Sequence, residues 1–307
     1  MNFEHSWGDG VCVLRMCNDV HAAVSKSCAS ALAEAGSVQA QSVSPLLFNT
    51  QAVAGDMAAA AKRFDEHAGG HCGSNANDCH VDNVLLAGSM KNIVVECKGL
   101  SRQQVKEFKV SPDGVMQMAI QLAYTRLHKQ TVSVYESAST SSFLRGRTET
   151  IRSCTPASAA FVATMNNQAA SAEDKNRSLR AACAVHGDVT FAALTGKGID
   201  RHLFALKQLA ARKSAPLPAF FALPAYSRMV HNTLSTSTLS SPALDGGGFG
   251  PVTADGYGVG YGIQDDGSGF SVTSYMDTLP AFGGALQEAV ADIQAVLQET
   301  AKKSKNE

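Results

Sequence analysis

The sequence predicts an α/β protein whose mixed β-sheet is flanked by helices. Helical hydrophobic spacing recurs in four segments, at 156–167, 172–187, 201–213 and 283–301. Residues 256–263 and 269–275 instead alternate as strands around Asp265-Asp266-Gly267, a turn signal that predicts a β-hairpin. Because a hairpin pairs its strands antiparallel and helical crossovers pair strands in parallel, we expect a mixed sheet.

Local signals place further elements along the chain. Ser111-Pro112-Asp113 combines an N-cap serine with proline at the first helical position, and helical spacing follows as far as Leu127. Thr131–Tyr135 alternates as a strand. The helix predicted at 283–301 presents one apolar stripe, formed by Leu286, Val290, Ile293 and Leu297.

The first third of the chain is less regular. Residues 1–24 predict a strand-and-helix fragment, 25–44 a linker rich in Ala, Ser and Gln, and 67–92 a polar surface insertion. Side chains typical of a protein core, such as Phe3 and Trp7, occur at the very start of the chain with no helix cap or introductory segment before them. We therefore expect further sequence upstream. The first ten residues, MNFEHSWGDG, do not have the pattern of a signal or transit peptide.

Composition excludes several classes of protein. The chain has 307 residues, of which 45% are apolar, enough for one large or two medium domains. A net charge of −1 with dispersed basic residues argues against general nucleic-acid binding. Eight cysteines are too sparse for a disulfide scaffold, which favours reduced thiols inside a cell. No apolar run is long enough to span a bilayer.

Residues 234–261 have the composition expected of a segment that lines an active site. Ser235-Thr236-Ser237 could donate a hydrogen bond to a developing oxyanion, although a Ser/Thr-rich strand edge explains the pattern equally simply. No Gly-x-Ser-x-Gly elbow is present, which disfavours a covalent serine hydrolase. The best candidate general base is His5, followed by Asp9; the alternative is an ordinary exposed histidine.

Other polar residues suggest anion binding. Tyr135 and Thr148 lie in segments that could bind a carboxylate together with an arginine, or could be ordinary strand ends. Arg201 follows Asp200, a plausible N-cap, and stands where an arginine opposes the helix dipole. The cations before Ser111 suit a phosphate, or form a solvated face; they are Arg102, Lys106 and Lys109.

The insertion also gathers potential metal ligands, which are His67, His71, Cys72, Cys79 and His80. No Cys-x-x-Cys pair accompanies them, so a polar insertion is favoured over a zinc site.

Five segments resemble, in this order, the carnitine/choline acyltransferase family. They are NFEHSWGDGVCVLR, VSPDGVMQMAIQLAYTR, YESASTSSFLRGRTETIR, GIDRHLFALKQLA, and LSTSTLSSPA with GGFGPVTADGYGVGY. The resemblance implies two domains of chloramphenicol-acetyltransferase-like, two-layer fold. Residues 1–46 would end the first domain and 47–307 would form the second, with the insertion at about 67–92.

The same resemblance implies roles for individual residues. The catalytic set would be His5 as general base, Asp9 beside it and Ser237 as oxyanion donor. The residues implied at carnitine are Tyr135, Ser137, Thr148, Arg201 and Phe249. Those implied at coenzyme A are Arg102, Lys106 and Asp113, and Gly247 would leave the acyl pocket open.

The implied reaction moves a medium or long fatty acyl group between coenzyme A and carnitine. Both molecules are substrates, and neither a cofactor nor a metal is implied. The resemblance further implies a mitochondrial place, on the matrix side of the inner membrane and with peripheral membrane association, and no nucleic-acid partner. The alternative is a non-catalytic module that binds coenzyme A or a partner protein.

Overall fold

The computed structural model describes residues 9–31, 90–97, 100–238, 240–244, 246–265 and 267–306, with single residues at 55, 58, 59 and 62. They belong to two units, which are described separately. Unit 1 holds helix α1 and a short segment from Ser241, and unit 2 holds the sheet and the remaining helices. Within these ranges, none of the helices has both the length and the apolar content that crossing a bilayer requires.

In unit 1, α1 spans Gly10–Ala31. The linker expected at 25–44 is therefore wrong for residues 25–31, which continue the helix; residues 32–44 lie outside the described residues. Ser241 donates a hydrogen bond from its hydroxyl to Oδ1 of Asn18 on α1. This contact joins the short segment that starts at Ser241 to α1 within the unit.

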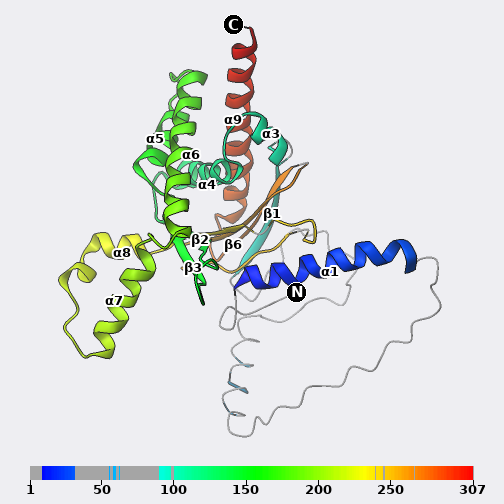
Figure 1. Cartoon of the computed structure of the whole chain (residues 1–307). Helices are drawn as coiled ribbons and strands as arrows, with labels where there is room; N and C mark the ends of the chain where they lie inside the picture. The colour runs from blue at the N-terminus through cyan, green and yellow to red at the C-terminus, as the bar shows by residue number, and fades with distance from the viewer. Residues whose placement is uncertain are drawn as a thin grey trace. The chain divides into compact units, whose positions relative to one another are not determined.

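Unit 2 is built on a six-stranded sheet (Figure 1). Its strands, in spatial order, are β1 (Lys91–Cys97), β6 (Ser268–Ser274), β5 (Tyr257–Ile263), β4 (Leu234–Thr238), β2 (Val134–Ser139) and β3 (Thr148–Ile151). Strands β2, β4 and β5 pair in parallel, and the other pairs are antiparallel. The mixed sheet and the β5–β6 hairpin are thereby confirmed.

Two strand boundaries differ from expectation. The strand expected at 131–135 begins at Val134 instead; the hydroxyl of the preceding residue, Ser133, donates to the carbonyl of Met229 at 2.6 Å. The insertion expected to end at residue 92 overlaps β1, which starts at Lys91. Residues 67–89 of that insertion, with its histidines and cysteines, lie outside the described residues.

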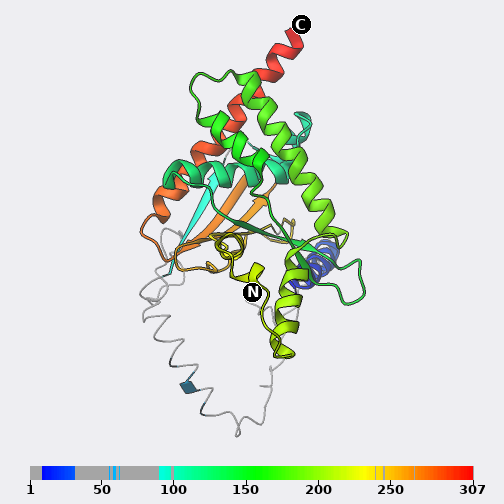
Figure 2. The same ribbon diagram turned by 90° about the vertical axis from the view of Figure 1, so that its left-hand side faces the viewer.

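The helices α4, α5, α6 and α9 cover one face of the sheet (Figures 1 and 2). Helix α4 (Pro112–His128) begins as predicted, with Ser111 as N-cap accepting from the amide of Gly114 at 3.2 Å. It is buried along most of its length and forms the centre of the core. The others are α5 (Pro156–Asn166), α6 (Ala172–Leu194) and α9 (Leu279–Asn306). The predicted apolar stripe of α9 is confirmed, because all four of its residues are buried.

Four further helices complete the described part of unit 2. Helix α3 (Arg102–Glu107) precedes α4, and α7 (Asp200–Arg212), η3 (Ala219–Ala222) and α8 (Pro224–Val230) extend from the side of β3 (Figure 1). Ser101 caps α3 through a capping box with Gln104.

Alternation along the strands gives the sheet two different faces. The helix-covered face carries the core residues Val95, Val134, Leu234, Tyr257, Val259, Phe270 and Val272. Strand register places small or polar residues on the other face, namely Asn92, Tyr135, Ser137, Ser235, Ser237, Gly258, Gly260, Ser271 and Thr273. We call this the polar face of the sheet, and four of the predicted site residues lie on it, namely Tyr135, Ser137, Thr148 and Ser237.

Candidate active site

Arg201, Tyr135 and Thr148 come together at the β2–β3 side of the sheet. The Nη2 atom of Arg201 donates to the Tyr135 hydroxyl at 3.0 Å and to the Thr148 hydroxyl at 3.1 Å. Its Nε atom donates to the Thr148 carbonyl at 3.2 Å, and its guanidinium lies 5.9 Å from the centre of the Tyr135 ring. One cation and two hydroxyls converge there, a donor set suited to a carboxylate. The structure thus brings together the three residues that the sequence proposed for one site.

Ser137 lies beside this trio on the same face. It is two residues after Tyr135 on β2 and is paired with Thr150 of β3. The Thr150 hydroxyl is buried and has no hydrogen-bond partner among the described residues. Sequence reasoning gave Thr150 no role, although its position two residues after Thr148 on a strand places both on one face.

The start of α7 differs from expectation, and the difference explains how Arg201 is placed. The prediction that Asp200 caps the helix is wrong: the N-cap is Ile199, which makes no side-chain cap bond. The carboxylate of Asp200 is instead paired with the guanidinium of Arg152, whose Nε donates to Oδ2 at 2.7 Å. Because Arg152 directly follows β3, this ion pair holds the first turn of α7 against the strand that contains Thr148.

Ser237 lies on the polar face of β4, where it is paired with Gly260 of β5. The intervening Thr236 points to the helix-covered face, donates to the Tyr135 carbonyl at 2.9 Å and accepts from Nε2 of Gln117 at 2.9 Å. This bridge holds β2 and β4 together at the level of Tyr135. The predicted oxyanion donor Ser237 and Tyr135 of the candidate carboxylate site therefore lie on two strands that this bridge joins.

A glycine-rich loop packs against the polar face of β5. A Cβ on Gly258 would lie 2.5 Å from the Phe249 carbonyl, and one on Gly260 would lie 2.4 Å from the Gly247 carbonyl. The Thr273 hydroxyl donates to the same Phe249 carbonyl at 2.5 Å. The two strand glycines are therefore required by the close approach of the loop backbone. Gly247 differs, because a Cβ there would meet nothing within 4 Å.

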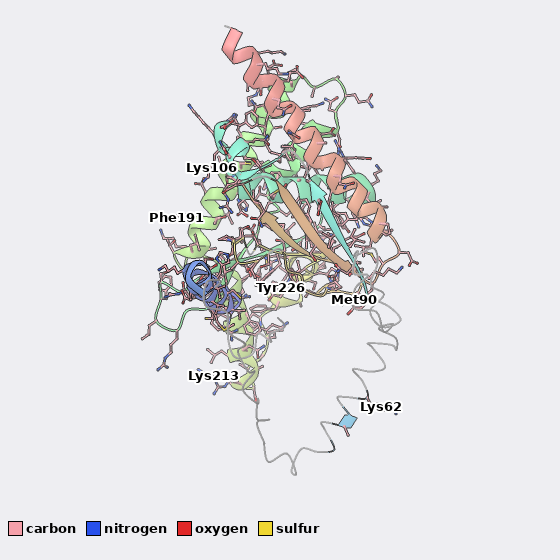
Figure 3. The ribbon with its side chains drawn as sticks, turned by 90° about the vertical axis from the view of Figure 1, so that its right-hand side faces the viewer. Lys62, Met90, Lys106, Phe191, Lys213 and Tyr226 are labelled. Carbon is pink, nitrogen blue, oxygen red and sulfur yellow. The ribbon has the colours of Figure 1, made fainter. Side chains whose placement is uncertain are left out.

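The residues proposed for coenzyme A lie around α3 and the start of α4. Arg102 donates from Nη2 to the Ile263 carbonyl at 2.6 Å, which anchors it at the end of β5. Lys106 is exposed on the same helix (Figure 3). Asp113, in the first turn of α4, accepts a hydrogen bond from the Tyr261 hydroxyl at 2.7 Å. Arg102 and Lys106 are one turn apart on α3, a spacing that allows both to contact one anion.

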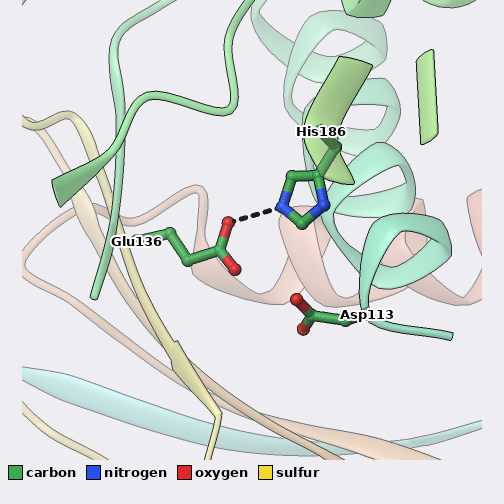
Figure 4. A group of neighbouring side chains, drawn as sticks. All are labelled: Asp113, Glu136 and His186. Atoms are coloured by element: carbon green, nitrogen blue, oxygen red, sulfur yellow. Dashed lines mark hydrogen bonds and ion pairs between the residues drawn. The ribbon is translucent and has the colours of Figure 1, made fainter. Parts of the chain in front are cut away.

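A buried acid–base cluster lies behind β2 (Figure 4). The Nε2 atom of His186 and Oε2 of Glu136 are 2.8 Å apart, and neither side chain is more than 4% exposed. The nitrogen and oxygen atoms with which these two side chains and Asp113 could bind a metal ion all lie within 4.8 Å of one another. This is the only group of that kind among the described residues. Each already has a hydrogen-bond partner, so the cluster has the character of an internal network rather than a vacant ligand site.

The sequence held a signal for this pair. Glu136 lies between Tyr135 and Ser137, so strand alternation turns it toward the helices. His186 continues the buried stripe of α6 formed by Leu179, Ala182 and Cys183.

The pair makes stability depend on pH. Burial raises the pKa of Glu136 from 4.5 to about 7, against the opposing hydrogen bond from His186. For His186, burial lowers the pKa, but the hydrogen bond and charge of Glu136 outweigh it and raise the pKa overall. Both groups hold their protons more tightly in the folded state, so their contribution is present at low pH and is lost as pH rises through about 7.

We therefore expect the free energy of unfolding to fall by about 2 kcal/mol between about pH 5 and pH 8, measured by urea titration. Glu136→Gln should remove this fall, because the buried imidazole left alone has a lowered pKa and favours neutral pH. An unchanged pH profile in Glu136→Gln would contradict the assignment.

The predicted general base is not placed by these observations. His5 lies outside the described residues, and Asp9 immediately precedes α1 in unit 1, where its carbonyl accepts from the amide of Cys12 at 3.0 Å. Their position relative to Ser237 stays a prediction.

A mixed sheet layered by helices on one face, with a cation and hydroxyls gathered on the other, defines an α/β protein with a candidate anion-binding site. The chain belongs to the choline/carnitine O-acyltransferase family, whose model matches residues 1–288.

Curated relatives agree with this assignment. The chain is 39% identical over 285 residues to mitochondrial carnitine O-palmitoyltransferase 2 of Homo sapiens, covering 90% of this chain and 40% of that protein. It is 38% identical over 194 residues to a putative mitochondrial carnitine O-acetyltransferase of Saccharomyces cerevisiae, covering 62% of this chain and 28% of that protein. The chain thus spans about 40% of the length of the human relative.

Solved structures are more distant. The epimerization domain of tyrocidine synthetase B gives a TM-score of 0.41 at 10% identity, covering 94% of this chain and 67% of that chain. The wax ester synthase/diacylglycerol acyltransferase of Marinobacter aquaeolei VT8 gives 0.37 at 9% identity, covering 70% and 51%. At these values the likeness carries no inference about function.

Proposed function

We propose that this chain forms the carnitine-binding part of a carnitine O-acyltransferase and moves a medium or long acyl group between coenzyme A and carnitine. The observation that carries the proposal is the convergence of Arg201 with the hydroxyls of Tyr135 and Thr148. Carnitine has a carboxylate for this site to bind, whereas choline has none. The name of the human relative, a carnitine palmitoyltransferase, supports the same substrate and a long acyl chain.

The chemistry we propose needs no covalent enzyme intermediate. His5 takes the proton from the carnitine hydroxyl, and the freed oxygen attacks the carbonyl carbon of the acyl thioester. Ser237 donates to the oxyanion that forms, an interaction worth about 3–4 kcal/mol at the transition state. When the C–S bond breaks, the coenzyme A sulfur leaves and takes the proton back from His5, and Asp9 assists this base.

Other residues of the unit would bind the remaining parts of the substrates. Phe249 is proposed to face the trimethylammonium of carnitine as a cation–π partner, with Ser137 beside the carboxylate trio. Arg102 and Lys106 would bind a phosphate of coenzyme A, and Asp113 would lie near that substrate. The space around Gly247 supports a pocket for a long acyl chain, since a Cβ there meets no neighbour.

The names of the relatives also support a mitochondrial location, for which we propose the matrix side of the inner membrane with peripheral membrane association. Carnitine and coenzyme A act as substrates, and we propose no cofactor.

Turnover tests the proposal directly. We expect carnitine-dependent release of coenzyme A from palmitoyl-coenzyme A, followed with a thiol reagent. Ser237→Ala should lower kcat by about 10²–10³-fold, because the oxyanion loses one preorganised donor. Thr238→Ala, one residue further on β4 and exposed, is the matched control and should change kcat by less than about threefold.

Two results would overturn the catalytic proposal. Full activity of Ser237→Ala would remove the oxyanion donor from the mechanism. Binding of both substrates without turnover would favour a non-catalytic binding module, a second candidate consistent with the 40% coverage of the human relative.

A further inference from the structure

Glu149 is a buried carboxylate on β3. It follows directly on Thr148, which together with Arg201 and Tyr135 forms the candidate carboxylate site. Glu149 is 6% exposed and forms no ion pair with any described residue. A lone buried carboxylate is costly unless backbone amides satisfy it. Its Oε1 atom accepts from the amide of Thr150 at 2.7 Å and from the amide of Arg201 at 3.2 Å, and Oε2 lies 3.4 Å from the same Arg201 nitrogen.

These bonds supply what the first turn of α7 lacks. The N-cap Ile199 has no side chain that could accept a hydrogen bond, so the first amides of the helix need an acceptor from elsewhere. Glu149 provides it from the neighbouring strand, and a negative charge at a helix N-terminus is also favourable. The amide that it fixes belongs to Arg201, the residue whose guanidinium reaches Tyr135 and Thr148.

Gly198 shows how closely the two segments meet. A Cβ on Gly198 would lie 2.3 Å from Cγ, 2.6 Å from Cδ and 2.8 Å from Oε2 of Glu149. The glycine has no positive φ, so the close contact with this carboxylate is the reason that it excludes a side chain. The Glu149 carboxylate therefore packs directly against the backbone at Gly198, which leads into α7.

We infer that Glu149 is a positioning residue for the proposed carnitine site: it holds the backbone of Arg201 so that the guanidinium reaches the Tyr135 and Thr148 hydroxyls. This inference rests on the proposed function only for the identity of the ligand. Glu149 itself does not touch the ligand; it acts through the Arg201 amide, and the Arg152–Asp200 ion pair braces the same turn from the other side.

The closing experiment uses the full chain and needs no ligand in its first part. Hydrogen exchange of the Arg201 amide and of its Nε–H is measured by NMR in the wild type and in Glu149→Ala, Glu149→Gln and Gly198→Ala. We expect at least tenfold faster exchange in Glu149→Ala and in Gly198→Ala, whose new methyl group displaces the carboxylate. Glu149→Gln keeps an acceptor oxygen and should stay within about threefold of the wild type.

Two controls separate positioning from general loss of stability. Ile151→Ala removes a buried side chain from the same strand and should leave the Arg201 protons protected relative to the rest of the sheet. In the double variant Glu149→Ala/Gly198→Ala, the methyl group has no carboxylate to displace, so it should add little to the effect of Glu149→Ala alone.

The second part measures binding of L-carnitine by calorimetry. Glu149→Ala should raise the Kd of carnitine about tenfold and leave the Kd of palmitoyl-coenzyme A unchanged, with Glu149→Gln close to the wild type. Unchanged Arg201 exchange in Glu149→Ala would overturn the inference, as would a Glu149→Gln variant as impaired as Glu149→Ala. If the wild type binds no carnitine while the exchange pattern appears as expected, the proposed function fails and the positioning role of Glu149 stands.

Discussion

Arg201→Ala is expected to weaken binding of L-carnitine by about two to four orders of magnitude, because two charge-assisted hydrogen bonds to a carboxylate are each worth about 1.5–3 kcal/mol. The guanidinium that would make them is already held against Tyr135 and Thr148. Choline lacks the carboxylate, so whatever affinity it has should change little. Isothermal titration calorimetry with both ligands measures the difference.

Two further variants sharpen this test. Arg201→Lys keeps the charge but loses the planar fork, and should fall between the wild type and Arg201→Ala. Arg212→Ala, exposed at the far end of the same helix, is the control and should bind carnitine normally. Equal losses for carnitine and choline in Arg201→Ala would contradict a carboxylate site.

Arg152→Ala is expected to lower the free energy of unfolding by about 3–5 kcal/mol, because removing one partner strands a largely desolvated charge. The side chains of Arg152 and Asp200 are only 18% and 9% exposed. Arg152 also donates to the Ser133 hydroxyl at 3.0 Å and to Oδ1 of Asn232 at 2.8 Å, so its loss leaves these two groups and the Asp200 carboxylate without this donor.

Urea unfolding followed by circular dichroism measures the loss. The matched control is Arg177→Ala, which breaks an exposed pair with Asp174 on α6 and should cost less than about 1 kcal/mol. A change below 1 kcal/mol in Arg152→Ala as well would show that the ion pair does not hold α7 against β3.

Several local elements could be predicted from the sequence. The hairpin at β5–β6, the capped start of α4 and the apolar stripe of α9 follow from short-range patterns, and all three are present. The strand order was out of reach, because pairing of β2 with β4 depends on contacts a hundred residues apart.

Errors arose where a side chain serves a distant partner instead of its neighbours. Asp200 has the position of an N-cap in sequence, yet its carboxylate pairs with Arg152, 48 residues earlier. Strand alternation indicates that Glu136 turns toward the helices, but no local pattern identifies His186, 50 residues later, as its partner. Likewise, only the three-dimensional arrangement reveals that the buried Glu149 carboxylate accepts a hydrogen bond from the amide of Arg201.

The glycines around β5 differ in how freely evolution or design can alter them. A side chain on Gly258 or Gly260 would collide with a carbonyl oxygen of the opposing loop, so any larger residue there must push that loop away. Gly247 faces open space and can accept a side chain without a change in the backbone. Position 247 is therefore the place on this loop where a larger side chain disturbs the structure least. Bulk can be added there while the strands that carry Ser237 and Tyr135 keep their register.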